Sequence, residues 1–138
     1  MKQAVRLHET RIESEVAFHD VDSMRIVWHG HYYKYFELAR TKLLRERGLD
    51  AGELIGKKYR FYVIESRCRH SFPLHYGERA RICAWVRDKR HRVMIQFEVT
   101  NLDHDRRAAR GFTALATVDA DHNLLLETPD EIQRKLLA

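Results

Sequence analysis

One helical stretch followed by a long series of alternating segments constrains the fold of this sequence most. Between Gly30 and Gly48, aromatic and apolar side chains recur at the three- and four-residue intervals of an α-helix with one buried face. The expected buried face comprises Tyr32, Phe36, Ala39 and Leu43, widened by Tyr35, Leu38 and Leu44. Gly48 follows the helix and predicts a C′ glycine. Most of the remaining chain has the period of two that is typical of β-strands. We therefore expect an α+β fold, with one long central helix packed against an antiparallel β-sheet.

Five alternating segments predict the strands and their buried side chains. They are residues 8–18, 61–72, 79–87, 93–99 and 107–118, with a polar connection at 51–58. In the third and fourth, the expected inward residues are Ala80, Ile82, Ala84, Val86, Val93, Ile95, Phe97 and Val99. In the first, one face is expected to hold Thr10, Ile12, Ser14, Val16 and Phe18. In the second, one face is expected to hold Tyr62, Ile64, Ser66, Cys68, His70 and Phe72. A Thr-Pro-Asp-Glu sequence from Thr128 predicts a short C-terminal helix.

Length and composition are typical of one globular domain, expected to cover residues 1–138. No apolar run approaches the ~20 residues that span a bilayer, and the N-terminal residues lack the apolar core of a signal peptide. Cys68 and Cys83 form no C-x-x-C motif, which predicts reduced thiols in a cytoplasmic protein. The net charge of +5 suits an anionic ligand. No aromatic and basic motif of a nucleic-acid-binding module is present, so we do not expect that function.

The best indication of function lies immediately before the helix, in HDVDSMRIVWHGHYYKYFELAR (His19–Arg40). This segment contains two carboxylates, Asp20 and Asp22, and the imidazoles of His29 and His31. Such groups can transfer protons, bind a metal ion or close a turn. Their spacing matches neither a zinc finger nor an H-E-x-x-H motif, so we expect no metal site. From the residues alone, proton transfer and turn formation both remain open.

The segment FHDVDSMRIVWHGHYYKYFELART resembles the opening signature of hotdog-fold acyl-CoA thioesterases of the 4-hydroxybenzoyl-CoA thioesterase type. The matching positions are Asp20, Asp22, Val27, His29, Tyr32, Glu37, Ala39 and Arg40. CRHSFPLHYGERARI and VRDKRHRVMIQFEV resemble later strands and turns of the family, so the resemblance covers most of the chain. It implies an antiparallel sheet wrapped around one long helix, and a homodimer with active sites at the subunit interface that often pairs again into a homotetramer. It also implies hydrolysis of an acyl-CoA thioester without a metal or organic cofactor, CoA being part of the substrate.

Two positions depart from the family pattern. A glycine of the signature is replaced by Arg25, and Phe18 stands where some members have tyrosine. Because a side chain disfavours positive φ, we expect the loop to lack the family's left-handed conformation at Arg25. Any role of the tyrosine phenol is absent at position 18.

The resemblance assigns the catalytic role to Asp22, with His29 in support. Asp22 is expected to activate water or to attack the thioester carbonyl itself. The poorly capped helix start offers free N–H groups and the positive end of the helix dipole, which suit an oxyanion. The expected oxyanion and substrate-binding residues are Gly30, His31 and Tyr32. The basic hairpin RDKRHR is expected to bind the CoA phosphates. Its CoA-binding residues are Lys89, Arg90 and Arg92.

A second function stays open: a non-catalytic hotdog domain that binds acyl-CoA or acyl-carrier protein. The two functions differ in whether Asp22 is needed for hydrolysis. The sequence does not determine whether the acyl group is short, long or aryl, nor whether CoA or a carrier protein bears it. Tyr33, Tyr35, Phe36 and Tyr62 either line an aryl pocket or fill the core.

Overall fold

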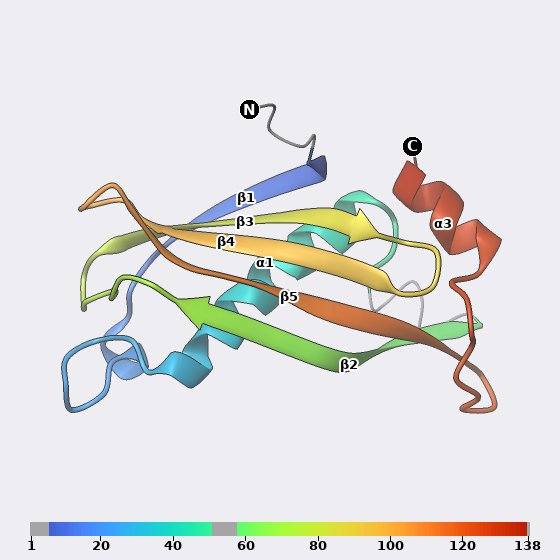
Figure 1. Cartoon of the computed structure of the whole chain (residues 1–138), viewed down its shortest axis with the longest axis horizontal. Helices are drawn as coiled ribbons and strands as arrows, with labels where there is room; N and C mark the ends of the chain where they lie inside the picture. The colour runs from blue at the N-terminus through green and yellow to red at the C-terminus, as the bar shows by residue number, and fades with distance from the viewer. Residues whose placement is uncertain (1–5, 51–57, 138) are drawn as a thin grey trace.

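One antiparallel sheet and one long helix form the body of the protein (Figure 1). The computed structural model describes residues 6–50 and 58–137. Most of the expected connection at 51–58 therefore lies outside the described residues. In spatial order the strands are β1 (Leu7–Glu15), β3 (Arg79–Asp88), β4 (Val93–Asn101), β5 (Arg106–Asp119) and β2 (Tyr59–His70). Helix α1 (Tyr32–Glu46) crosses one face of the sheet. The expected α+β architecture with a central helix is confirmed.

Helix α1 buries nearly all of the predicted face. Its buried residues are Tyr32, Tyr35, Phe36, Ala39, Leu43 and Leu44. The ring of Phe36 stacks on that of Phe97 in β4, with centroids 4.4 Å apart. Leu38 was also expected on this face, but it is 49% exposed. Two residues along an α-helix correspond to about 200° of rotation, so Leu38 points away from the sheet when Phe36 points toward it.

The C-terminus of α1 is a Schellman motif. Gly48 has φ of 69°, and its N–H donates to the Arg45 carbonyl at 3.1 Å. The Leu49 N–H donates to the Leu44 carbonyl at 2.8 Å. Both bonds satisfy carbonyls that the helix leaves free, and the left-handed conformation suits glycine. The predicted C′ glycine is confirmed.

The two central strands confirm the predicted alternation. All eight predicted inward residues of β3 and β4 are buried, with exposures between 0% and 4%. Cross-strand pairs such as Ala84 with Phe97 place these side chains on one face, beneath α1. The sheet therefore supplies most of the apolar surface on which the helix rests.

A bulge in β2 reverses part of the predicted alternation. The register with β5 shifts between Val63 and Glu65. Val63 lies opposite the buried Leu115, and after the shift His70 lies opposite the buried Ala109, so both point toward α1. The extra residue in the strand moves Tyr62 to the other face. The prediction that Tyr62 shares a face with Cys68 and His70 is therefore wrong.

The first strand is shorter than predicted. β1 ends at Glu15, and the chain then forms the short 3₁₀ turn η1 (Phe18–Asp20). Phe18 is 74% exposed, and its ring meets Tyr76 edge-on at 5.6 Å. The prediction that Phe18 extends the buried face of this strand is wrong, because the chain has left the sheet before it.

The predicted C-terminal helix is present as α3 (Asp130–Leu137). It packs near the end of α1, where Lys135 Nζ donates to the Gly48 carbonyl at 3.1 Å. Its buried side chains, Ile132 and Leu136, join the same core. Over residues 6–50 and 58–137, no helix is long and apolar enough to cross a membrane.

Candidate active site

The turn before α1 presents the Asp22 carboxylate. The Asp22 N–H donates to the Ile26 carbonyl at 3.0 Å, and the Arg25 N–H donates to the Asp22 carbonyl at 2.9 Å. The half-buried side chain of Asp22 closes the turn, since its Oδ1 accepts the Met24 N–H at 2.8 Å. Within the described part of the chain, Oδ2 of Asp22 has no hydrogen-bond partner. That oxygen is therefore free to meet a ligand.

Arg25 adopts the left-handed conformation that the sequence was expected to exclude. Its φ is 68°, so that expectation is wrong. An L-residue in this region is disfavoured by about 1–2 kcal/mol. The hydrogen bonds that close the Asp22–Ile26 turn depend on this backbone path and offset the strain. The turn geometry is thus kept without the glycine.

Asp20 anchors the turn from inside the protein. It is 3% exposed, accepts a hydrogen bond from Tyr35 Oη at 3.0 Å and pairs with Lys34 Nζ. Burial by itself raises the pKa of Asp20, but the bonds from Lys34 and Tyr35 outweigh it and lower the pKa below the usual value. The Asp20 carbonyl also accepts the Trp28 N–H at 3.0 Å. Asp20 is therefore an ionised structural carboxylate that ties the loop to α1.

A cleft of about 480 Å³ joins this turn to the end of β2. One side consists of Asp22, Met24, Ile26, Val27, His29 and Tyr32, and the other of His70, Ser71, Phe72 and Pro73. The structure thus brings together three predicted site residues, Asp22, His29 and Tyr32. The second side was not predicted as part of a site. Its one sequence signal is Pro73, which marks the end of a strand but not what that end faces.

His70 adds an imidazole to the cleft. Its ring meets the Tyr32 ring edge-on at 4.7 Å and lies 6.4 Å from the His29 ring. His70 Nε2 is 3.5 Å from Cys68 Sγ. Burial raises the pKa of Tyr32 to about 12 and that of Cys68 to about 11, so both stay protonated at neutral pH. Across the described residues, no group of three or more His, Cys, Asp or Glu side chains is arranged to hold a metal ion.

The helix start beside the cleft has no side-chain caps. A 3₁₀ turn, η2 (His29–His31), leads into α1, and neither Trp28 nor His31 makes a capping side-chain bond. The Trp28 indole covers Gly30 so closely that a Cβ there would lie 2.2 Å from the ring. Gly30 and His31 do not line the cleft itself. The His31 N–H donates to the Trp28 carbonyl at 2.9 Å, and the Tyr32 N–H donates to the His29 carbonyl. The expected oxyanion role of Gly30, His31 and Tyr32 stays a prediction.

The basic hairpin lies at the other end of the sheet from Asp22 within one protomer (Figure 1). Val93, which follows the hairpin, pairs with Leu115, whereas His70 of the cleft pairs with Ala109 near the start of β5. Arg90 and Arg92 contact the segment after β5, since Arg90 Nε is 3.9 Å from Glu127 Oε1 and Arg92 Nη1 donates to the Leu126 carbonyl at 3.4 Å. Lys89, Arg90 and Arg92 therefore do not join the cleft of their own protomer.

The aromatic residues considered for an aryl pocket separate into two groups. Tyr35 and Phe36 are buried in the core, at 2% and 0% exposure. Tyr33 and Tyr62 are 41% and 45% exposed, and neither lines the cleft. Tyr62 instead lines a second cavity of about 370 Å³, between β2 and the C-terminal half of α1. Core packing is therefore the role of the two buried rings.

The second cavity is lined by apolar side chains and by the half-buried Arg40, among others. Phe61, Val63 and Leu115 form part of its apolar surface. Arg40 also lines it and donates from Nη1 to Thr113 Oγ1 at 3.5 Å. Burial lowers the pKa of Arg40, although nearby Glu37 opposes the shift. Arg40 thus contacts the sheet through Thr113 of β5.

A long helix enclosed by a five-stranded antiparallel sheet of order β1-β3-β4-β5-β2 defines the hotdog class of folds. The chain belongs to the thioesterase-like superfamily, whose family model matches residues 16–136. The chain is 32% identical over 82 residues to "Putative acyl-CoA thioesterase YneP" from Bacillus subtilis (strain 168), a match that covers 59% of this chain and 59% of that relative.

Solved structures share this fold over most of their length. The 1,4-dihydroxy-2-naphthoyl-CoA thioesterase Slr0204 from Synechocystis has a TM-score of 0.82 and 16% identity, covering 94% of this chain and 96% of that chain. The protein SAV2348 from Staphylococcus aureus, solved in complex with CoA, has a TM-score of 0.84 and 13% identity, covering 99% and 86%. These similarities establish the hotdog fold. They do not confirm the 4-hydroxybenzoyl-CoA type.

Proposed function

We propose that this protein hydrolyses an acyl-CoA thioester to a carboxylic acid and CoA. The observation that carries the proposal is Asp22 Oδ2, which has no hydrogen-bond partner among residues 6–50 and 58–137. It lies in a cleft beside a helix start without side-chain caps. A carboxylate and a cluster of backbone N–H groups are the two elements that acyl transfer requires. Membership of the thioesterase-like superfamily and the CoA-related names of its relatives support the same chemistry.

In the proposed reaction, Asp22 Oδ2 takes a proton from water while the water oxygen attacks the thioester carbonyl carbon. The alternative route is direct attack by Asp22, giving an anhydride that water then hydrolyses. In either case the carbonyl oxygen becomes an oxyanion, which the helix start stabilises with the Gly30 N–H as donor. The C–S bond then breaks, and the CoA thiolate takes up a proton. His29 stands in the same cleft and is placed to orient water or to deliver this proton.

We further infer a homodimer formed by two β2 strands. β2 is an edge strand, and it exposes the apolar side chains of Tyr62, Val63 and Ile64 to between 45% and 50%. An exposed edge with apolar side chains pairs readily with another strand. A two-fold axis would pair the strands antiparallel and set the Tyr59 end of one β2 beside the His70 end of the other. The cleft would then lie at the subunit interface.

The same dimer would give the basic hairpin a role. Within one protomer Lys89, Arg90 and Arg92 lie at the end of the sheet remote from Asp22. A two-fold axis through β2 brings this end of one subunit to the cleft end of the other. We propose that the CoA phosphates bind the hairpin of the partner subunit, where guanidinium groups suit phosphate oxygens.

Replacing Ile64 with lysine is expected to convert the dimer to a monomer, because paired β2 strands would bring the two new charges together. Light scattering after size exclusion should give 16.5 kDa for the variant and twice that mass for the wild type. Leu126→Lys is the matched control, since Leu126 is 85% exposed and lies outside β2. A monomeric wild type, or an Ile64→Lys variant that stays dimeric, would show that β2 is not the interface.

A panel of short, long and aryl acyl-CoA thioesters, including 4-hydroxybenzoyl-CoA, tests the function. Release of free thiol is expected for at least one class, with kcat on the order of 1–10³ s⁻¹. The second candidate function, binding without hydrolysis, is favoured by the basic composition, with a net charge of +5, which suits an acidic carrier protein. Tight binding of acyl-CoA or acyl-carrier protein without thiol release would establish that function instead.

A further inference from the structure

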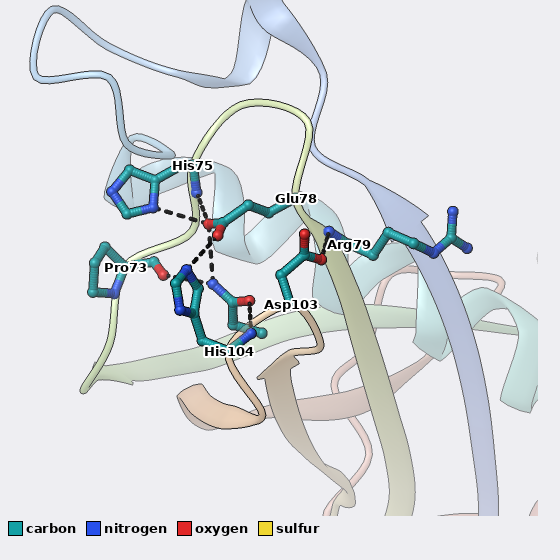
Figure 2. Close-up of polar contacts among 7 residues, drawn as sticks. Pro73, His75, Glu78, Arg79, Asp103 and His104 are labelled. Atoms are coloured by element: carbon teal, nitrogen blue, oxygen red, sulfur yellow. Dashed lines mark hydrogen bonds and ion pairs between the residues drawn. The ribbon is translucent and has the colours of Figure 1, made fainter.

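A carboxylate joins two loops behind the cleft (Figure 2). Glu78, whose side chain is 13% exposed, accepts from His75 N at 2.7 Å and lies 2.9 Å from His75 Nδ1, both through Oε1. The same oxygen accepts from the buried Asn101 Nδ2 at 3.1 Å. The second oxygen, Oε2, lies 2.7 Å from His104 Nε2. Glu78 therefore joins the loop after β2 to the turn between β4 and β5.

Asn101 extends this cluster to the cleft wall. Its Nδ2 also donates to the Pro73 carbonyl at 3.1 Å, and Pro73 lines the cleft. Its Oδ1 accepts the His104 N–H at 3.1 Å. The His104 ring in turn meets the ring of Phe72, a second residue of the wall, at 5.4 Å. Pro73 and Phe72, on one side of the cleft, thus contact the group formed by Glu78, His75, Asn101 and His104, which we call the Glu78 cluster.

The cluster also reaches the turn that carries Asp22. His75 forms an antiparallel bridge with Ile26, and the Val27 N–H donates to the Leu74 carbonyl at 2.9 Å. Ile26 is the residue whose carbonyl accepts the Asp22 N–H at 3.0 Å. A backbone hydrogen bond from Val27 to Leu74 therefore joins the segments around Ile26 and His75, and this connects the loop that Glu78 holds to the turn of Asp22.

A largely buried carboxylate is expected to be fully bonded, since an unpaired one would be strongly destabilising. Burial alone raises the pKa of Glu78, but the bonds from His75 and Asn101 outweigh it, and the pKa is lowered. The carboxylate is therefore ionised at neutral pH. Hydrogen bonds to an ionised acceptor are stronger than those between neutral groups, so this is a firm attachment point for both loops.

We propose that Glu78 is a positioning residue that holds the cleft wall and the Asp22 turn in register with each other. The inference rests on the proposed thioesterase function for its effect on rate, but not for its effect on structure. Glu78 does not line the cleft and touches no reacting atom, so its influence passes through His75, Asn101 and the two loops. Displacement of reacting groups by about 1 Å can lower a rate by up to roughly 100-fold.

The test compares Glu78→Ala with Asp103→Ala. Asp103 lies in the same β4–β5 turn, but its carboxylate accepts the Arg79 N–H at 3.0 Å and does not contact the cleft wall (Figure 2). Glu78→Ala is expected to lower kcat about 10- to 100-fold while KM changes by less than about threefold. Asp103→Ala is expected to leave both nearly unchanged. Equal losses in kcat for the two variants would reduce Glu78 to a general contributor to stability and overturn the proposal.

Two further measurements separate a positioning role of Glu78 from a general loss of stability. Glu78→Gln keeps the size of the side chain and can still bond Asn101, His75 and His104, so it is expected to retain kcat within about threefold. A Glu78→Gln variant as slow as Glu78→Ala would overturn positioning by hydrogen bonds.

Hydrogen exchange at the Val27 amide is a second measurement, and it needs no substrate. It is expected to speed up in Glu78→Ala and not in Asp103→Ala. Unchanged Val27 exchange would refute the positioning role, whereas absence of turnover in the wild type would refute only the proposed function.

Discussion

Replacing Asp22 with asparagine is expected to lower kcat/KM for the best acyl-CoA substrate by about 10²–10⁴-fold, the contribution typical of a general base. The asparagine amide oxygen can still accept the Met24 N–H that closes the turn. The loop should therefore persist, and the melting temperature should change little. The variant loses the negative oxygen that takes a proton from water or attacks the carbonyl. Free-thiol release and a thermal melt of the same preparation measure both effects.

Asp119→Asn is the matched control for this prediction. Asp119 also closes a local turn, since its Oδ1 accepts the N–H groups of Asp121 and Asn123, both at 2.9 Å. It ends β5 at the end of the sheet remote from the cleft of its own protomer, and its Oδ2 also accepts from Asn123 Nδ2 at 3.3 Å. Because both of its oxygens are bonded within its own turn, its replacement is expected to leave kcat/KM within about twofold. If Asp22→Asn retained more than about a tenth of the wild-type rate, another group would have to act on the thioester.

Replacing Gly111 with alanine is expected to lower the free energy of unfolding by about 3 kcal/mol, at the upper end for an added methyl in a packed core. A Cβ at Gly111 would lie 2.0 Å from the Arg67 carbonyl oxygen and 2.8 Å from the Phe36 ring. The first contact is with the backbone of the paired strand, so no side-chain rotation relieves it. The melting temperature should fall by roughly 10 °C for a chain of this size. Denaturant unfolding and calorimetry measure the two quantities.

Gly77→Ala separates this clash from the ordinary effect of losing a glycine. Gly77 has φ of +80°, but an added Cβ would meet nothing within 4 Å. Backbone strain alone is therefore expected, at about 1–2 kcal/mol. Adding Phe36→Leu to Gly111→Ala should not restore stability, because the Arg67 carbonyl still blocks the methyl group. Full recovery in that double variant would show that the ring, and not the strand backbone, limits the site.

Local pattern accounted for much of the fold. The alternation in β3 and β4 placed residues such as Ile82 and Phe97 in the core, where both are fully buried. Gly48 ended the helix as predicted, because the left-handed C′ position depends on the residue itself. Half of the candidate site could be predicted from the sequence for the same reason. Asp22, His29 and Tyr32 lie close together in the chain, and one motif contains them all.

The errors arose where an interaction or a change of chain path outweighed the preference of a single residue or of an alternating pattern. Residue Tyr62 changed face because a bulge altered the pairing of β2 with β5, which the alternation of β2 alone does not record. Arg25 took a left-handed φ because closure of the Asp22 turn outweighed its local preference. Phe18 left the sheet because β1 ends before it.

By itself, the sequence determined the helix, its C-terminal stop, the inward faces of the central strands and the motif that carries Asp22. These follow from side-chain periodicity and from the conformational preferences of single residues, which act within a few positions of the chain. The tertiary structure alone decided that His70 and Pro73 form the opposite wall of the cleft, that the basic hairpin lies at the far end of the sheet, and that Glu78 joins two loops behind the site. These features depend on strand order and register, because pairing between remote segments sets which side chains meet.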